Sequence, residues 1–227
     1  KESFYLTKIK ENISKEKSNN FVFFDIGCNK GFYTQALIDV FGEENKFFLF
    51  EASDRFFDIT CKKFENKSNI STLNKGVSSS VGSIEFHELE SSNDEIEGMS
   101  SVNKRPVFDS YSYNKKTIET ISIDIFVEEN NIENIDFIKI DTEGHELEIL
   151  NGMKNSLLSK KVKYIQIEYG DCLLETGKDL TDILSFLKDY DYKVFDGSNN
   201  SLVEITSENV GNFIKIKWDN YLIIKND

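Results

Sequence analysis

Apolar residues along the chain fall into short runs that alternate with segments of helical spacing. Strand-like runs, rich in Phe, Ile and Val, cover residues 21–26, 46–51, 135–140 and 162–167. Apolar residues at helical spacing cover 33–41, 53–64, 147–157 and 180–187. Runs of this kind are typical of strands buried on both faces of a parallel sheet, and strand–helix alternation builds right-handed crossovers. The pattern predicts a doubly wound α/β domain with a mostly parallel sheet and helices on both faces.

The centre and the C-terminal part of the chain depart from this rhythm. Residues 70–77 and 83–89 predict two strands around a Ser-Gly turn, whereas residues 90–117 are polar, aperiodic and hold the one proline, Pro106. A long irregular segment in a compact domain is a lid, a binding loop or disordered, and the pattern favours a mobile lid and plain disorder equally. Residues 192–227 alternate like short strands, the last over 218–224, and predict an antiparallel hairpin at the sheet edge. No repeat or linker divides residues 1–227, so we expect a single domain.

Composition narrows the classes of function. Hydrophobic residues form 39% of the chain and aromatic residues 13%, which is enough for a substantial core. The 40 acidic and 27 basic residues leave a net charge of −13, which repels nucleic-acid phosphates and anionic lipids. No apolar run is long enough to span a membrane, and no charged-then-apolar leader opens the chain. We therefore expect no nucleic-acid or membrane partner.

The cysteines and histidines are few and scattered. Cys28, Cys61 and Cys172 are odd in number and lack paired spacing, so we expect reduced thiols in a cytoplasmic protein. The histidines, His87 and His145, are too few for a His-rich metal site, and we predict no metal. We interpret His87 as a surface strand residue. A first residue other than Met is compatible with a domain cut from a longer protein.

The sequence Asp25-Ile-Gly27-Cys-Asn29-Lys-Gly31 stands between the first predicted strand and the first predicted helix. Glycines there let the backbone turn tightly and let a ligand lie against it. The spacing differs from the Gly-x-Gly-x-x-Gly of dinucleotide sites, and the Asp25 carboxylate would repel a pyrophosphate. Glu51 closes the second strand, where a carboxylate can accept both hydrogens of a ribose diol. Two carboxylates without a phosphate cradle suit S-adenosylmethionine, whose amino and sulfonium groups are positive.

A denser motif at residues 138–152 runs from a buried strand through a tight turn into a helix. It places Asp141, Glu143, His145 and Glu146 at the C-terminal end of the strand, where open α/β sheets bind their ligands. Glu146 can also have a structural role, because an acidic residue stabilises a helix N-terminus. Asp141 at the strand tip is our first candidate for a catalytic base, with Glu143 and His145 as alternatives. A divalent ion held by Asp141 and Glu168 is a further alternative.

Together, Asp25-x-Gly-x-Asn-x-Gly31 and Lys139-Ile-Asp-Thr-Glu-Gly-His-Glu-Leu-Glu-Ile-Leu-Asn-Gly152 resemble the FkbM-type methyltransferases. Supporting pieces follow in order at residues 50–51, 74–78, 121–124 and 165–168. The resemblance implies the class I (Rossmann-like) fold with a seven-stranded sheet and S-adenosylmethionine as cofactor. It also implies O-methylation of a hydroxyl on a sugar, a glycan or a related small molecule.

The motifs and the resemblance together assign the site residues. The cofactor-binding residues are Asp25, Gly27, Asn29, Gly31, Thr34, Glu51, Ser53, Val77, Ser78 and Asp141. The catalytic residues are Asp141, Glu143 and His145. The chain departs from the family pattern at Ser78, where an acidic residue is frequent, and at His145, which occupies a variable position.

Two other classes of function stay open. A nicotinamide-dependent sugar oxidoreductase could use the same kind of sheet, but its dinucleotide fingerprint is absent. Its usual Tyr-x-x-x-Lys pair is matched by Tyr111 and Lys115 only inside the irregular segment. A non-catalytic S-adenosylmethionine-binding module would keep the cofactor site and lose the acceptor site. The intact Asp141-x-Glu143 argues against such decay.

Overall fold

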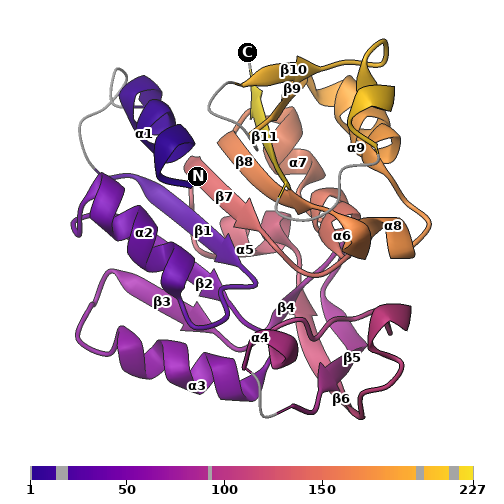
Figure 1. The fold of residues 1–227 in the computed structure, drawn as a ribbon. Coiled ribbons are helices and arrows are strands. Elements are labelled where there is room, and N and C mark those ends of the chain that lie inside the picture. The colour runs from indigo at the N-terminus through magenta and orange to yellow at the C-terminus, as the bar shows by residue number, and fades with distance from the viewer. Residues whose placement is uncertain (1, 14–19, 92–93, 198–201, 215–219, 227) are drawn as a thin grey trace.

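The computed structural model describes residues 2–13, 20–91, 94–197, 202–214 and 220–226 (Figure 1). An eight-stranded sheet in the order β10-β9-β11-β8-β7-β1-β2-β3 forms the centre, and a three-stranded sheet, β4-β6-β5, lies beside it. The strands are β1 Val22–Ile26, β2 Lys46–Phe50, β3 Ile70–Leu73, β4 Gly76–Val77, β5 Gly82–Leu89, β6 Tyr113–Ile121, β7 Ile135–Ile140, β8 Val162–Tyr169, β9 Tyr192–Asp196, β10 Val203–Ile205 and β11 Asn220–Asn226.

Helices connect most of these strands. The α-helices are α1 Glu2–Ile13, α2 Phe32–Phe41, α3 Asp54–Lys63, α4 Asp94–Glu97, α5 Ile123–Glu129, α6 Glu146–Asn151, α7 Lys154–Leu158, α8 Asp171–Glu175 and α9 Leu180–Leu187. Short 3₁₀ helices are η1 Pro106–Phe108, η2 Lys188–Tyr190 and η3 Val210–Asn212. The strand–helix alternation read from the sequence is confirmed for β1-α2-β2-α3 and for β7 to β8.

The predicted α/β class is confirmed, and the predicted number of strands is wrong by one. Strands β3, β2, β1, β7 and β8 are all parallel. Strand β11 is antiparallel to both β8 and β9. The eighth strand is the short edge strand β10, which pairs with residues 194–196 of β9. A three-residue edge strand has too few positions to show a period in the sequence.

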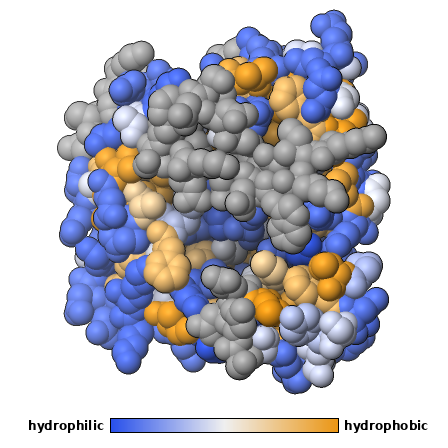
Figure 2. All heavy atoms as spheres, in the orientation of Figure 1, coloured by the Kyte–Doolittle hydropathy of each residue, from blue (hydrophilic) through white to orange (hydrophobic). Residues whose placement is uncertain are grey.

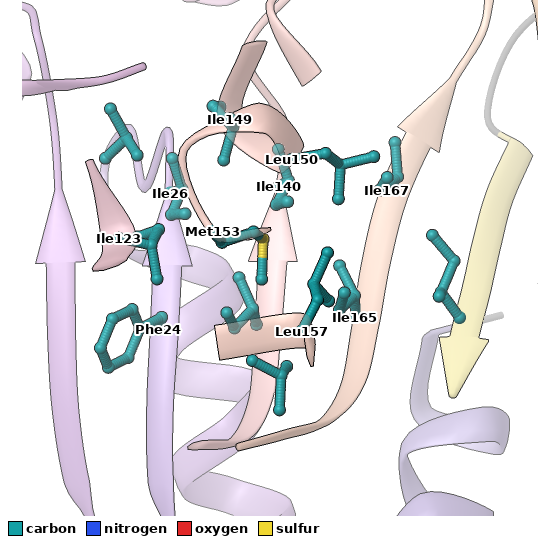
Figure 3. Close-up of a cluster of buried hydrophobic side chains, with 14 of the residues drawn as sticks. Phe24, Ile26, Ile123, Ile140, Ile149, Leu150, Met153, Leu157, Ile165 and Ile167 are labelled. Atoms are coloured by element: carbon teal, nitrogen blue, oxygen red, sulfur yellow. The ribbon is translucent and has the colours of Figure 1, made fainter. Parts of the chain in front are cut away.

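Two apolar layers hold the helices on opposite faces of the sheet. Helices α1 and α2 pack on one face against a Phe-rich surface that includes Phe23, Phe47 and Phe137. Helices α5, α6, α7 and α9 pack on the other face. Figure 3 shows side chains of β1, β7 and β8 meeting those of α6 and α7 there, with Met153 at the centre. Phe23 and Phe24 point to opposite faces, and both faces are buried. The sequence of β1 is therefore a continuous apolar run and does not alternate.

The helix predicted over residues 147–157 is two helices, α6 and α7. They separate at Gly152, whose carbonyl accepts the N–H of Asp124 at 3.0 Å instead of continuing the helix. The predicted strand over 70–77 is likewise two strands, because β3 pairs with β2 and β4 pairs with β6 in the other sheet.

The irregular segment is shorter than the sequence suggests. Strand β6 begins at Tyr113 and pairs antiparallel with β5 over residues 113–120, so the irregular part ends near residue 112. Within it, α4 and η1 are short helical turns. Pairing with β5 is a long-range contact that the local pattern of 113–117 does not reveal.

Two further expectations are corrected. His87 on β5 is buried, not a surface residue, and its imidazole lies edge-on to Tyr113. The predicted antiparallel hairpin at the sheet edge is present as β9 and β10, but the last strand, β11, lies inside the sheet between β8 and β9. Trp218, which the sequence placed in this strand, lies outside the described residues. Helix α1, for which the sequence gave no expectation, covers the Phe-rich face.

The described residues contain no helix that is both long and apolar enough to cross a membrane. Figure 2 shows mostly hydrophilic residues on the coloured part of one face, with apolar residues in small separate groups.

We predict that Gly152→Ala lowers the free energy of unfolding by about 1–3 kcal/mol, the usual cost of overpacking. An alanine Cβ would lie 2.1 Å from the carbonyl oxygen of Ser78, which is a backbone atom and cannot move aside alone. Urea unfolding measures the change. Gly211→Ala is the matched control, because nothing lies within 4 Å of its added Cβ. Equal stabilities for the two variants would contradict the close approach.

Candidate active site

A cavity of about 560 Å³ opens where β1, β2 and β7 end. This volume is within the usual range for sites that bind small molecules. Its wall combines the β1–α2 turn, the residues after β2, the three-stranded sheet, the segment 97–102 and the loop after β7. Several of the predicted site residues line it: Gly27, Asn29, Glu51, Ser53, Val77, Asp141, Glu143 and His145.

The β1–α2 turn is pressed against the loop after β7. Gly27 has φ +73°, and a Cβ there would lie 1.9 Å from the carbonyl oxygen of Asp141. Its N–H donates to the carbonyl of Phe50 at 3.0 Å, so the turn is also tied to the end of β2. Only glycine combines this backbone conformation with such a close approach.

Glu51 binds the same turn from the other side. Its Oε2 accepts the backbone N–H of Asn29 at 2.7 Å, and its Oε1 accepts that of Ser53 at 2.8 Å. Burial raises the pKa of Glu51 in spite of these two hydrogen bonds. A carboxylate has about four lone-pair positions, so two stay available to a ligand in the cavity. Ser53 precedes α3, but its Oγ donates to Glu88 at 2.8 Å and does not cap the helix.

Lys139 on β7 lies at the centre of the site and is buried. Its Nζ donates to the carbonyl of Gly27 at 2.9 Å and pairs with Asp141 at 3.0 Å and Asp25 at 3.6 Å. Burial alone would lower the pKa of Lys139, but the charges of Asp141 and Asp25 raise it above its ordinary value. The ammonium therefore stays charged and links β1 to β7.

Asp25 and Thr34 lie behind the cavity wall, not on it. Asp25 is buried, and its Oδ2 accepts the hydroxyl proton of Thr34 at 2.6 Å. Gly31 does not line the cavity either, and a Cβ there would lie 2.6 Å from the ring of Phe64. These residues shape the turn, and Asp25 neutralises Lys139. None of these three residues lines the cavity.

Asp141 is hydrogen-bonded to the ammonium group of Lys139 and to the carboxyl group of Glu168. Burial alone would raise its pKa, but Lys139 and a hydrogen bond from Glu168 lower it. The charge of Asp141 and burial in turn raise the pKa of Glu168 to about 10. At neutral pH, Asp141 is therefore ionised and Glu168 is protonated. The Asp141 side chain is 30% exposed, so its carboxylate is open to the cavity.

Glu143 lies two residues further along, in a left-handed backbone conformation with φ +56°. It forms an ion pair with Arg105, which comes from the irregular segment. Burial and the charge of Asp141 raise the pKa of Glu143 to about 8, against the opposing effect of Arg105. Glu143 therefore keeps its proton to a higher pH than Asp141 does.

Glu146 holds the loop between β7 and α6 in place. Its Oε1 accepts the backbone N–H groups of Thr142 and Gly144, each at 3.1 Å. This is the structural role that its place at the start of α6 suggested, extended to the loop itself. His145 is beside it, with Nε2 2.9 Å from Oγ of Ser78. Burial lowers the pKa of His145, so the imidazole is neutral.

Part of the irregular segment, for which the sequence left a lid and disorder equally open, covers the cavity. Gly98, Met99, Ser100 and Val102 line it. Arg105 anchors the segment, because its Nε donates to Glu175 of α8 at 2.7 Å while its Nη1 pairs with Glu143. Whether the segment moves stays a prediction.

Sequence reasoning gave no role to Lys139, Arg105 or Gln166, all of which are buried at the site. A signal existed for two of them. Lys139 and Gln166 interrupt the apolar runs of β7 and β8, and buried polar side chains need partners. Arg105 had no such signal, because it lies in an aperiodic segment.

The described residues include no group of three or more His, Cys, Asp or Glu side chains placed to hold a metal ion. Their cysteines are free thiols, with Cys28 and Cys172 buried.

Comparison with known proteins identifies relatives of this chain. The family model for the methyltransferase FkbM domain matches residues 25–194. The hexuronic acid methyltransferase AglP of Haloferax volcanii is 33% identical over 175 residues, which cover 77% of this chain and 65% of that protein. The chain thus spans about two thirds of the length of this relative.

Solved structures share the fold. The crystal structure of methyltransferase FkbM from Methylobacillus flagellatus KT has a TM-score of 0.59 and 16% identity, over 91% of this chain and 44% of that one. The N-terminal domain of human METTL16 has a TM-score of 0.50 and 13% identity, over 98% of this chain and 68% of that one. These similarities are to class I methyltransferase folds.

We predict that Arg105→Gln speeds amide hydrogen exchange over residues 96–112, because it removes both ion pairs that anchor the segment. Exchange followed by mass spectrometry measures the effect. Lys104→Gln is the matched control, since Lys104 is adjacent but exposed and pairs only with the exposed Asp109 among the ion pairs described. If both variants exchange like the wild type, Arg105 does not hold the segment.

Proposed function

The chain belongs to the FkbM methyltransferase family, and from this membership we propose that it transfers a methyl group from S-adenosylmethionine to an oxygen of a sugar or glycan. One observation carries the proposal. A single cavity joins Glu51, at the end of β2, to Asp141, at the end of β7, around the Gly27 turn. When bound, the cofactor supplies an electrophilic methyl group.

The residues present fit this cofactor. Glu51 has lone pairs free for a ribose diol, and Ser53 and Val77 line the same part of the cavity. The lack of a Cβ at Gly27 keeps the turn close to the loop after β7, so both segments can contact one ligand. The ionised carboxylate of Asp141 favours a cationic ligand over a phosphate.

Asp141 is the residue that we propose as general base. It lines the cavity, is ionised at neutral pH and is 30% exposed. Lys139 and Glu168 fix the direction of its carboxylate, and such positioning lets a hydroxyl be held for reaction. Glu143, which is paired with Arg105, and His145, which is hydrogen-bonded to Ser78, are the alternatives.

A second candidate acceptor is a carboxylate oxygen of an acidic sugar. The relative from Haloferax volcanii is by name a hexuronic acid methyltransferase. A carboxylate is already anionic at neutral pH, so its methylation needs no general base. A hydroxyl acceptor therefore needs Asp141 as a base, whereas a carboxylate acceptor does not.

Incubation with S-adenosylmethionine and a panel of neutral and acidic sugars tests the proposal. Methylated sugar, detected by mass spectrometry, is the expected product. Binding of NADH without binding of S-adenosylmethionine would support the oxidoreductase instead. Cofactor binding with no product across the panel would favour a binding module.

We predict that Glu51→Ala weakens S-adenosylmethionine binding by about 1–3 kcal/mol, the usual cost of unpaired polar groups. Calorimetry on a variant shown to be folded measures it. Glu43→Ala is the matched control, because Glu43 is exposed and pairs with Lys67. Unchanged affinity in folded Glu51→Ala would remove Glu51 from the cofactor site.

We predict that Asp141→Asn lowers turnover of a hydroxyl acceptor at least about 100-fold, because general-base help is lost while the shape is kept. Cofactor affinity, measured alongside, should stay near wild type. Near-normal turnover of that acceptor would mean that another group is the base. Chelation by EDTA would lower wild-type turnover only if Asp141 and Glu168 hold a divalent ion.

The pH dependence separates Asp141 from Glu143. With Asp141 as base, turnover shows no rise near pH 8, because the pKa of Asp141 lies below its ordinary value. With Glu143 as base, turnover would climb with pH around 8, since a carboxyl of pKa about 8 must lose its proton first. Initial rates across this pH range decide between them.

A further inference from the structure

One end of the cavity carries a buried hydrogen-bond donor that no described residue satisfies. Gln166, in the middle of β8, is 0% exposed and lines the cavity. Its Nε2 has no hydrogen-bond partner among the described residues. Of the described buried side chains with such an atom, it is the one that lines the cavity. An unsatisfied buried donor costs about 1–3 kcal/mol, so a ligand atom that accepts this hydrogen bond is favoured.

Tyr33 determines how the amide is turned. Its O–H donates to Oε1 of Gln166, which leaves the N–H₂ group for the cavity. Lys139 is the register neighbour of Gln166 on β7, and its Nζ lies 5.7 Å from the centroid of the Tyr33 ring. The amide is thus held next to a buried ammonium group.

A second feature at this end favours an anion. Helix α2 has ten residues, its N-cap Gly31 offers no side chain, and its first turn has no acidic residue. Lys30, Phe32 and Tyr33 line the cavity, so the N-terminus of the helix opens on it. The N–H groups and the dipole at such an end stabilise negative charge.

Nearby charges determine which anion fits. Asp141 and Glu143 line the same cavity, so a ligand group with only a negative charge meets repulsion when they are ionised. An α-amino acid end carries its own ammonium group and adds no net charge. Strand β8 is three positions from β2 in the sheet, so Gln166 lies roughly 14 Å across the cavity from the end of β2 that carries Glu51.

We propose that Gln166, turned by Tyr33 and placed beside the N-terminus of α2, binds the carboxylate of the amino acid end of S-adenosylmethionine. The inference rests on the proposed function, because it takes Glu51 as the adenosine end of the site. Gln166 is a binding residue here and has no part in the proton transfer.

Two thioether ligands isolate this contact. S-Adenosylhomocysteine has the amino acid end, and 5′-methylthioadenosine lacks it. Calorimetry should show Gln166→Leu weakening S-adenosylhomocysteine at least about tenfold, as expected for a lost hydrogen bond to a charged group, with 5′-methylthioadenosine unchanged. Gln166→Glu keeps the size but repels a carboxylate, so its loss should be larger and equally selective.

Gln35→Leu is the matched control. Gln35 is the chain's other glutamine; its amide donates to Asp39 within α2, and it does not line the cavity. It should change neither affinity. Tyr33→Phe removes only the O–H that turns the amide, so it tests the inference even if the Gln166 variants do not fold. We expect a smaller loss there, again confined to S-adenosylhomocysteine.

The other results overturn the inference. Equal losses for both ligands would mean a general structural role for Gln166, and no loss for S-adenosylhomocysteine would mean no contact. A raised KM for a sugar acceptor without a cofactor effect would assign the amide to the acceptor. Wild-type protein that binds neither thioether would refute the proposed function itself.

Discussion

The ion pairs of the buried Lys139 are the interaction on which the site depends. Its ammonium is bonded to the carbonyl of Gly27 and paired with Asp141 and Asp25, so it joins two strands that are adjacent in the sheet but more than a hundred residues apart. Removing one partner of a buried charge typically costs about 3–5 kcal/mol, because the other is left uncompensated. The β1–α2 turn and the loop after β7 are therefore fixed relative to each other by electrostatics as well as by packing.

This constraint also sets the charges that face the ligand. Lys139 keeps Asp141 ionised, and the charge of Asp141 raises the pKa values of Glu168 and Glu143. The protonation states of these four side chains thus depend on one another, and Asp141 is the exposed anion among them. A chain with a net charge of −13 can hold several carboxylates in one site because most of them there are neutral or paired.

The loop after β7 connects this charge pattern to the segment that covers the cavity. Glu146 fixes the loop through its backbone N–H groups, and Glu143 projects from it to Arg105. A change in the position of Arg105 therefore changes the pKa of Glu143, which lies close to Asp141. The segment that carries Arg105 is therefore coupled to the site directly, through the Arg105–Glu143 ion pair.

The sequence by itself determined the α/β class, four of the five parallel strands and the two motifs at their ends. These features are local: apolar runs need two buried faces, and Gly27 and Gly31 need backbone conformations that other residues avoid. Only the tertiary structure decided that Asp25 supports Lys139 and does not line the cavity, that β11 lies inside the sheet, and that Arg105 and Gln166 reach the site. Those outcomes depend on pairing between distant segments, and the burial and partners of a polar side chain exist only once that pairing has formed.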